Sequence, residues 1–224
     1  MKNKFQKIKE TVEKELDCAA HGMDHILRVH NMCLVLAKKQ DVDIEVLKAA
    51  ALLHDIGGPR EMKDSSGKTD HAIESAKMAK PILQKLGFAE KKIKHIQDCI
   101  VSHRYRSDNK PKTIEAKILF DSDKLDVLGA IGIARGLAWI GKNNAYIFRK
   151  VNLKKYVKEN LAGGKLGGRI KDKTLHSPQM DFETKLKFIP EKLYTKKAQQ
   201  IGKERLKYTK DFLIRLEREI IAKL

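Results

Sequence analysis

The chain has 224 residues and carries 47 Lys and Arg residues against 29 Asp and Glu residues, so its formal net charge is +18. Hydrophobic residues make up 42% of the chain, which is enough for a packed core and excludes a wholly disordered protein. No run approaches the roughly 20 apolar residues of a membrane-spanning helix, and the N-terminus lacks the apolar core of a signal peptide. We therefore expect a compact cytoplasmic protein with no membrane partner.

The positive charge is distributed unevenly. Residues 150–224 hold 20 basic and 9 acidic side chains, so the C-terminal third is the more basic part of the chain. Such charge attracts nucleic acid or small phosphorylated molecules, but a lysine-rich surface also simply keeps a protein in solution. The charge alone does not select a partner.

The three cysteines do not indicate a disulfide framework. Cys18, Cys33 and Cys99 are odd in number, lie far apart and form no CxxC pair. We interpret them as buried reduced thiols.

In chain order, apolar residues first recur at helical spacing over residues 3–17 and 24–39, which predicts two amphipathic helices. The next helix has Asp43 as its N-cap, an almost wholly apolar body and a stop at the Gly-Gly-Pro run of residues 57–59. Because it is apolar nearly all round, this helix should be central.

A polar loop over residues 59–69 then precedes a helix over residues 70–86, which Pro81 should kink or end early. Two further helices are predicted over residues 89–104 and 112–123.

The C-terminal part begins with an Ala- and Gly-rich helix over residues 128–140. A Gly-rich, charged segment over residues 161–180 is typical of a mobile surface excursion, and a long charged amphipathic helix over residues 196–222 closes the chain. Since no segment alternates like a strand, the predicted fold class is all-α.

The sharpest chemical signal is the adjacent pair His54 and Asp55 at the end of the apolar helix. Burying an imidazole and a carboxylate unpaired is costly, and a divalent cation would satisfy both. A lone His-Asp pair more often caps its own helix, so companions are needed to indicate a metal site.

Two segments supply such companions. Upstream, His21 and His25 lie one helical turn apart, and Arg28 shares a helix face with His25, so that a ligand and a phosphate-binding cation point into one cleft. Downstream, the carboxylates Asp121, Asp123 and Asp126 surround Lys124. A bound cation would relieve the repulsion among these carboxylates. Solvated helix faces explain each segment separately, but they explain less well why these carboxylates lie between the apolar run ILF and the apolar helix VLGAIGIA.

The order His25, His54-Asp55, Asp123 resembles the H…HD…D metal-site signature of the HD-domain superfamily of metal-dependent phosphohydrolases. The segments HGMDHILRV, AALLHDIG, PKTIEAKILFDSDKLDVLGAIGIARG and KKAQQIGKERLKYTKDFL are similar to those of its small stand-alone, nucleotide pyrophosphohydrolase-like members. The resemblance implies one HD-domain helical bundle over residues 1–224, with a metal-site core at about 20–140 and a C-terminal helical extension at about 141–224.

The resemblance also implies the metal ligands His25, His54, Asp55 and Asp123. It favours Asp123 over the neighbouring carboxylates because the ligand in the family is the Asp before the basic residue, here Lys124. His71 and His103 follow the order of the superfamily's dinuclear branch, so they are either ligands of a second ion, with Asp55 bridging, or pocket residues that contact the substrate.

The expected reaction is attack of metal-activated water on a phosphoester or phosphoanhydride bond of a nucleotide or another small phosphorylated metabolite. His and carboxylate ligands suit Mn, Fe, Co, Ni, Zn or Mg, and the sequence does not choose among these divalent ions. Beside Asp55, the candidate catalytic residues are cations placed to bind phosphate: Arg28, Arg104 and Lys124.

Two alternatives differ in class. A di-iron oxygenase would use His71 and His103 as further ligands, and a nonenzymatic module would bind nucleic acid through the basic C-terminal part. We do not expect nucleic acid as the partner because no basic patch is interleaved with aromatic residues. The oligomeric state is left open.

Overall fold

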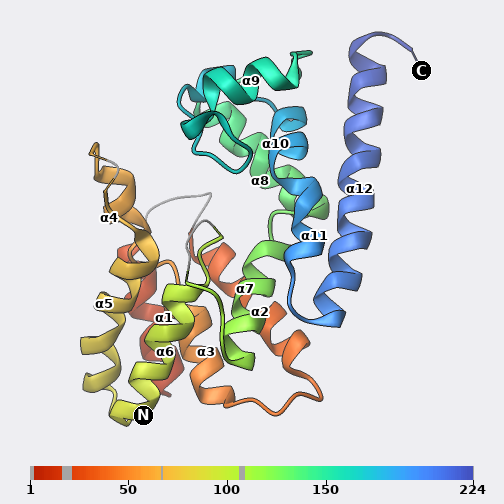
Figure 1. The fold of residues 1–224 in the computed structure, drawn as a ribbon. Helices are drawn as coiled ribbons and strands as arrows, with labels where there is room; N and C mark the ends of the chain where they lie inside the picture. The colour runs from red at the N-terminus through yellow and green to blue at the C-terminus, as the bar shows by residue number, and fades with distance from the viewer. Residues whose placement is uncertain (1–2, 17–21, 67, 106–108, 224) are drawn as a thin grey trace. The chain divides into compact units, whose positions relative to one another are not determined.

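The structure is a computed structural model that describes residues 3–16, 22–66, 68–105 and 109–223 (Figure 1). Within these ranges the chain forms helices and turns and no β-strand, so the predicted all-α class is confirmed. The chain divides into two compact units, Met1–Asp123 and Lys124–Leu224. The single domain expected over residues 1–224 stays a prediction.

The first unit is built around one apolar helix, α3 (Ile44–Leu53), whose residues are almost all buried. Asp43 caps it as expected, since its carboxylate accepts hydrogen bonds from two backbone amides of the first turn. Helix α3 packs against four neighbours: α1 (Lys4–Glu15), α2 (Met23–Ala37), α5 (His71–Lys85) and α6 (Glu90–Ser102). The last helix of this unit, α7 (Ile114–Leu125), runs across its boundary with the second.

The segment after α3 differs from the prediction. We expected a polar loop over residues 59–69, but a short helix, α4 (Gly58–Lys63), occupies its first part. Pro59 stands in the first turn of α4, where its missing N–H would have no partner within the helix in any case. Pro81 does not end α5, which continues to Lys85.

The turn that joins α3 to α4 is docked tightly on α5. The backbone amide of Gly57 donates a buried hydrogen bond to Ser75 Oγ at 2.9 Å. A Cβ atom on Gly57 would lie 2.6 Å from the Ser75 amide nitrogen, so this close approach requires glycine. The contact ties the position of the His54-Asp55 turn to that of α5.

The second unit contains the remaining helices and several 3₁₀ turns. Its longest element is α12, the long C-terminal helix predicted from the sequence, which packs against α8 (Figure 1). The α-helices of this unit are α8 (Gly129–Lys142), α9 (Leu153–Asn160), α10 (Pro178–Thr184), α11 (Ile189–Lys192) and α12 (Lys196–Ile220).

The Gly-rich segment lies on the surface, as expected, but hydrogen bonds hold its conformation. The backbone of Ala162 bonds to that of Arg169, and the Asn160 side chain bonds to both the amide and the carbonyl of Asp172. Below it, a small apolar cluster buries Tyr156, Leu161 and Met180. The expected mobile excursion is therefore a hydrogen-bonded turn that covers its own small core.

Two of the three cysteines lie in the described ranges, and both are buried free thiols, as predicted. Burial raises the pKa of Cys33 and of Cys99 to about 12. Cys18 lies outside the described residues. In the part of the chain that the structure describes, no helix is long and apolar enough to cross a membrane.

Candidate metal centre

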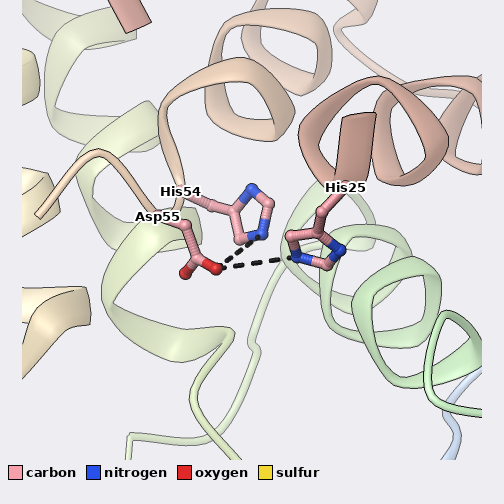
Figure 2. Close-up of side chains that lie close together, drawn as sticks. All are labelled: His25, His54 and Asp55. Atoms are coloured by element: carbon pink, nitrogen blue, oxygen red, sulfur yellow. Dashed lines mark ion pairs between the residues drawn. The ribbon is translucent and has the colours of Figure 1, made fainter. Parts of the chain in front are cut away.

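Five histidine and aspartate side chains from four separate segments of the chain meet within the first unit. They come from the beginning of α2, the turn after α3, the first residue of α5 and the end of α6. They form two groups that share Asp55: His25, His54 and Asp55, drawn in Figure 2, and Asp55, His71 and His103. In each group the potential ligand atoms lie within 4.8 Å of one another.

Two of these histidines are oriented by the same local device. His54 follows the last residue of α3, and its Nδ1–H donates to the carbonyl of Ala51 at 2.9 Å. His103 follows the last residue of α6, and its Nδ1–H donates to the carbonyl of Ile100 at 2.5 Å. Because a carbonyl only accepts, each neutral ring must carry its proton on Nδ1 and present an unprotonated Nε2.

The Asp55 carboxylate lies between the two groups and offers one oxygen to each. Oδ2 is 3.6 Å from His25 Nε2 and 3.7 Å from His54 Nε2, as the dashed lines in Figure 2 mark. Oδ1 is 3.3 Å from His103 Nε2 and 3.5 Å from His71 Nε2. The nitrogens therefore converge on a buried carboxylate from both sides.

Burial and neighbouring charges set the protonation states of His54 and Asp55. Burial lowers the pKa of His54 to about 4, so the ring is neutral near pH 7. Burial by itself would raise the pKa of Asp55, but the nearby His54, His103 and His25 outweigh it and hold this pKa well below its usual range. The pair thus combines a neutral imidazole with an ionised carboxylate.

His71 is oriented differently, through a carboxylate. Its Nδ1 lies 2.5 Å from Glu61 Oε2, and its Nε2 lies 3.3 Å from His103 Nε2. Burial would lower the pKa of His71, whereas Glu61 and Asp55 raise it, and the net shift is upward. Burial would likewise raise the pKa of Glu61, but hydrogen bonds from His71 and Arg104 lower it to about 2.

The three carboxylates near the end of α7 and directly after it have different surroundings. Asp123 Oδ1 lies 3.5 Å from His25 Nε2, which places Asp123 at the edge of the first group. Asp121 is fully buried, and Asp126 accepts a 2.6 Å hydrogen bond from Arg135 Nη1. Of the three carboxylates, Asp123 is thus seen beside a histidine of the cluster, while Asp126 is engaged by an arginine of the second unit.

The donor set fits a divalent cation. Among the described residues, the buried atoms His54 Nε2 and Asp55 Oδ1 have no hydrogen-bond partner. Buried polar atoms are rarely left in this way, because their desolvation is not repaid. Imidazole nitrogens and carboxylate oxygens are ligands of first-row divalent metals, so the cluster of His25, His54, Asp55, His71 and His103 could hold a metal ion.

The cations predicted to bind phosphate have partners in the structure. Arg28, one turn after His25 in α2, pairs with Asp24 at 2.6 Å. Arg104 pairs with Glu61 and with Asp70, both at 2.8 Å. Lys124 is half-buried and begins the second unit, and its role in phosphate binding stays a prediction, as do those of the two arginines.

Sequence reasoning missed Glu61 and Asp70, which surround His71 and Arg104. Glu61 fell in the stretch interpreted as a polar loop, although Pro59 two residues earlier was a signal for a helix start. Asp70 is the N-cap of α5 and accepts from the amide of Ala72, whereas the prediction took it as the first helical residue; Asp is a preferred N-cap residue, which was the signal for this role. His21 lies outside the described residues.

The chain is similar to known proteins both in sequence and in fold. The HD domain family model matches residues 22–128. A protein of Methanocaldococcus jannaschii, MJ0778, is 31% identical over 123 residues, which cover 48% of this chain and 68% of that protein. The crystal structure of an HD-superfamily hydrolase from Bacillus thuringiensis is similar with a TM-score of 0.69 and 25% identity, over 98% of this chain and 97% of that one.

A further relative is YpgQ of Bacillus subtilis, which is 24% identical over 208 residues, or 91% of this chain and 86% of YpgQ. Its crystal structure in complex with ADP has a TM-score of 0.69, with 20% identity over 96% of this chain and 94% of that one. On the family match, the relatives and the shared fold together, the chain belongs to the HD superfamily of hydrolases.

Proposed function

We propose that this protein is a metal-dependent phosphohydrolase that cleaves a phosphoester or phosphoanhydride bond of a nucleotide. Its metal ligands are His25, His54 and Asp55, with Asp123 beside His25. His71 and His103 face the other oxygen of Asp55 and complete the site.

One observation carries the proposal: the Nε2 atom of His54 and the Oδ1 atom of Asp55 are buried without a hydrogen-bond partner among the described residues. Around them, backbone carbonyls hold Nδ1 of His54 and of His103, so that both Nε2 lone pairs point at Asp55. A merely structural cluster would gain stability by satisfying these atoms. A site prepared for a cation leaves them available.

The protein's own groups are suited to phosphate chemistry in that setting. When bound, a divalent ion would lower the pKa of a coordinated water from about 15.7 toward about 7 and neutralise charge on phosphoryl oxygens. The ionised Asp55 supplies negative charge to such an ion, and the neutral His54 supplies a nitrogen lone pair. Arg28, next to the site on α2, is the cation that we assign to the phosphate groups, in exchange for its exposed partner Asp24.

The choice of a nucleotide is supported by a relative. YpgQ shares the fold over nearly its whole length, and its structure was determined in complex with ADP. A nucleoside diphosphate or triphosphate carries both an anionic chain for the cations and a phosphoanhydride bond for the metal site. We therefore place nucleotides first among phosphorylated substrates.

The test is hydrolysis by the chelator-stripped full chain after addition of single divalent metals. Nucleoside mono-, di- and triphosphates are screened with separate detection of phosphate and pyrophosphate, which also identifies the bond that is cut. Metal-dependent release that Asp55→Asn abolishes is the expected result. Full activity in the presence of excess chelator, or in Asp55→Asn, would refute the proposal.

The second group of potential ligands supports a second candidate function, that of a di-iron oxygenase. Since Asp55, His71 and His103 also lie within 4.8 Å of one another, the cluster has the donors for two ions, as a di-iron oxygenase would need. That function predicts turnover that requires oxygen and two irons per chain. Nucleotide hydrolysis at an undiminished rate under anaerobic conditions with manganese would exclude it.

A further inference from the structure

Glu61 is an acidic residue beside the cluster that is not itself one of the proposed ligands. It lies on α4, directly after the His54-Asp55 turn, and its side chain is 20% exposed. Both of its carboxylate oxygens are used: Oε2 accepts from His71 Nδ1 at 2.5 Å, and Oε1 accepts from Arg104 Nη2 at 2.8 Å. Glu61 therefore links α4, α5 and Arg104, the second residue after α6, around one imidazole.

The arginine closes a ring of contacts about His71. Arg104 Nη1 lies 2.8 Å from Asp70 Oδ1, and Asp70 is the N-cap of the helix that His71 begins. The Glu61 carboxylate is thus held from one side by Arg104 while it holds His71 from the other. This arrangement restricts the rotation of the His71 ring about its side-chain bonds.

The contact with Glu61 also decides which nitrogen of His71 is available. A carboxylate accepts hydrogen bonds and cannot donate when ionised, so His71 must carry a proton on Nδ1. Nε2 is then the atom that faces Asp55 Oδ1 at 3.5 Å and His103 Nε2 at 3.3 Å. His103 presents its own Nε2 for the same reason, since a backbone carbonyl holds its Nδ1.

We propose that Glu61 is a positioning residue that keeps Nε2 of His71 directed at Asp55 as a donor for a divalent cation. This inference rests on the proposed metal-dependent function and assigns Glu61 a part in it. Glu61 touches neither the cation nor the substrate, and it acts through His71.

A glutamine at this position shows why the carboxylate is needed. Glutamine has one acceptor oxygen, but two donors, His71 Nδ1–H and Arg104 Nη2, approach the side chain. If the amide oxygen turns to Arg104, its NH₂ group faces His71, which must then accept on Nδ1 and carry its proton on Nε2. A protonated Nε2 cannot bind a cation.

The chain offers a matched control in Glu74 on α5. Its side chain is also 20% exposed, and it also binds two cationic groups, Lys77 at 2.8 Å and Arg60 at 3.3 Å. No histidine is among the described contacts of the Glu74 side chain. Glu74→Gln therefore removes the same charge from the same unit without altering the tautomer of a histidine.

The experiment is a Mn²⁺ titration of the chelator-stripped full chain, with calorimetry as the readout. His71→Gln defines the part of the isotherm that depends on His71. Glu61→Gln should weaken that same part about 10- to 100-fold, the usual effect of removing a partner that orients a ligand. The double variant should bind no more weakly than His71→Gln, and Glu74→Gln should bind like the wild type.

A second readout needs no metal. Nitrogen-15 NMR of labelled histidine in the presence of chelator should show a signal from Nδ1-protonated His71, assigned by its absence in His71→Gln. Glu61→Gln should lose this signal, and Glu74→Gln should keep it. If Glu61→Gln does not fold, Glu61→Asp replaces it, because the shorter side chain withdraws the acceptor from Nδ1 and the same loss is expected.

Three results would overturn the inference while leaving the proposed function intact: wild-type binding by Glu61→Gln, wild-type binding by His71→Gln, or an unchanged His71 tautomer in Glu61→Gln. Failure of the function looks different. In that case the wild type itself would bind no Mn²⁺, or Asp55→Asn would bind it as well as the wild type.

Discussion

Each of the two units buries a histidine, and the surroundings of the two rings differ. In the first unit, His54 has one nitrogen on a backbone carbonyl and the other without a hydrogen-bond partner among the described residues, 3.7 Å from Asp55. In the second unit, His176 Nδ1 lies 2.6 Å from the Tyr156 hydroxyl, its Nε2 lies 3.8 Å from Asp181, and its ring packs edge-on against Trp139.

The difference distinguishes a chemical group from a structural one. Both rings are nearly inaccessible to water, so burial alone does not separate them. Both ring nitrogens of His176 contact polar groups of its own unit, whereas Nε2 of His54 keeps a lone pair directed at an ionised carboxylate. Substitutions in the first unit should therefore alter metal binding, and matched substitutions in the second should alter stability.

The largest effect is expected from the buried aspartates. Asp55→Asn should reduce metal-dependent hydrolysis roughly a thousandfold or more, because it removes the charge shared by both ligand groups. Asp126→Asn should keep the metal and lower the unfolding temperature, since Asp126 binds Arg135 in the second unit. Bound metal, hydrolysis rate and thermal unfolding are measured for both. Equal metal loss in the two variants would remove the distinction between the units.

The pH dependence of stability should depend on His54. Between pH 6.5 and pH 4 the unfolded chain binds a proton on this ring and the folded chain does not, because burial lowers its folded-state pKa to about 4. The stability of the metal-free protein should therefore fall as the pH is lowered through this window, by about 3 kcal/mol from His54. Denaturant unfolding with chelator measures it. His54→Gln should show a correspondingly smaller loss, and an identical pH slope would contradict the prediction.

A smaller effect should follow from removing the ring of the second unit. His176→Phe keeps an aromatic ring but removes one of the hydrogen-bond partners of the buried Tyr156 hydroxyl, which should lower the free energy of unfolding by about 1.5 kcal/mol. Metal affinity should not change. Denaturant unfolding and metal titration give the two values, and weakened metal binding in this variant would show that His176 is not merely structural.

The smallest effect is expected from two tightly packed glycines. A Cβ atom on Gly57 meets the Ser75 backbone at 2.6 Å, so Gly57→Ala should displace the metal-site turn, cost about 1 kcal/mol of stability and weaken metal binding. On Gly202 it meets the end of the flexible Leu193 side chain at 2.8 Å. Gly202→Ala, inside α12, should be close to neutral because helix propensity rises. Unfolding and metal titration compare the two variants, and unchanged metal affinity in Gly57→Ala would argue against coupling through Ser75.

Much of the architecture could be predicted because it depends on local sequence. The period of apolar residues identified the long helices, and Asp43 was recognised as a cap from its position alone. Two differences from the prediction both concern proline: α4 occupies the first part of the loop expected over residues 59–69, and α5 does not end early at Pro81. The effect of a proline depends on its place in a helix and on tertiary packing that local pattern does not include.

By itself, the sequence determined the all-α class and which histidines and aspartates were candidates for the site, because helix period and residue chemistry are local properties. The tertiary structure decided how these groups are used. It divided the two oxygens of Asp55 between two pairs of histidines, placed Asp126 on Arg135 and brought Glu61 to His71. These outcomes depend on which helix ends meet in space and which nitrogen of each ring is held, and neither follows from spacing along the chain.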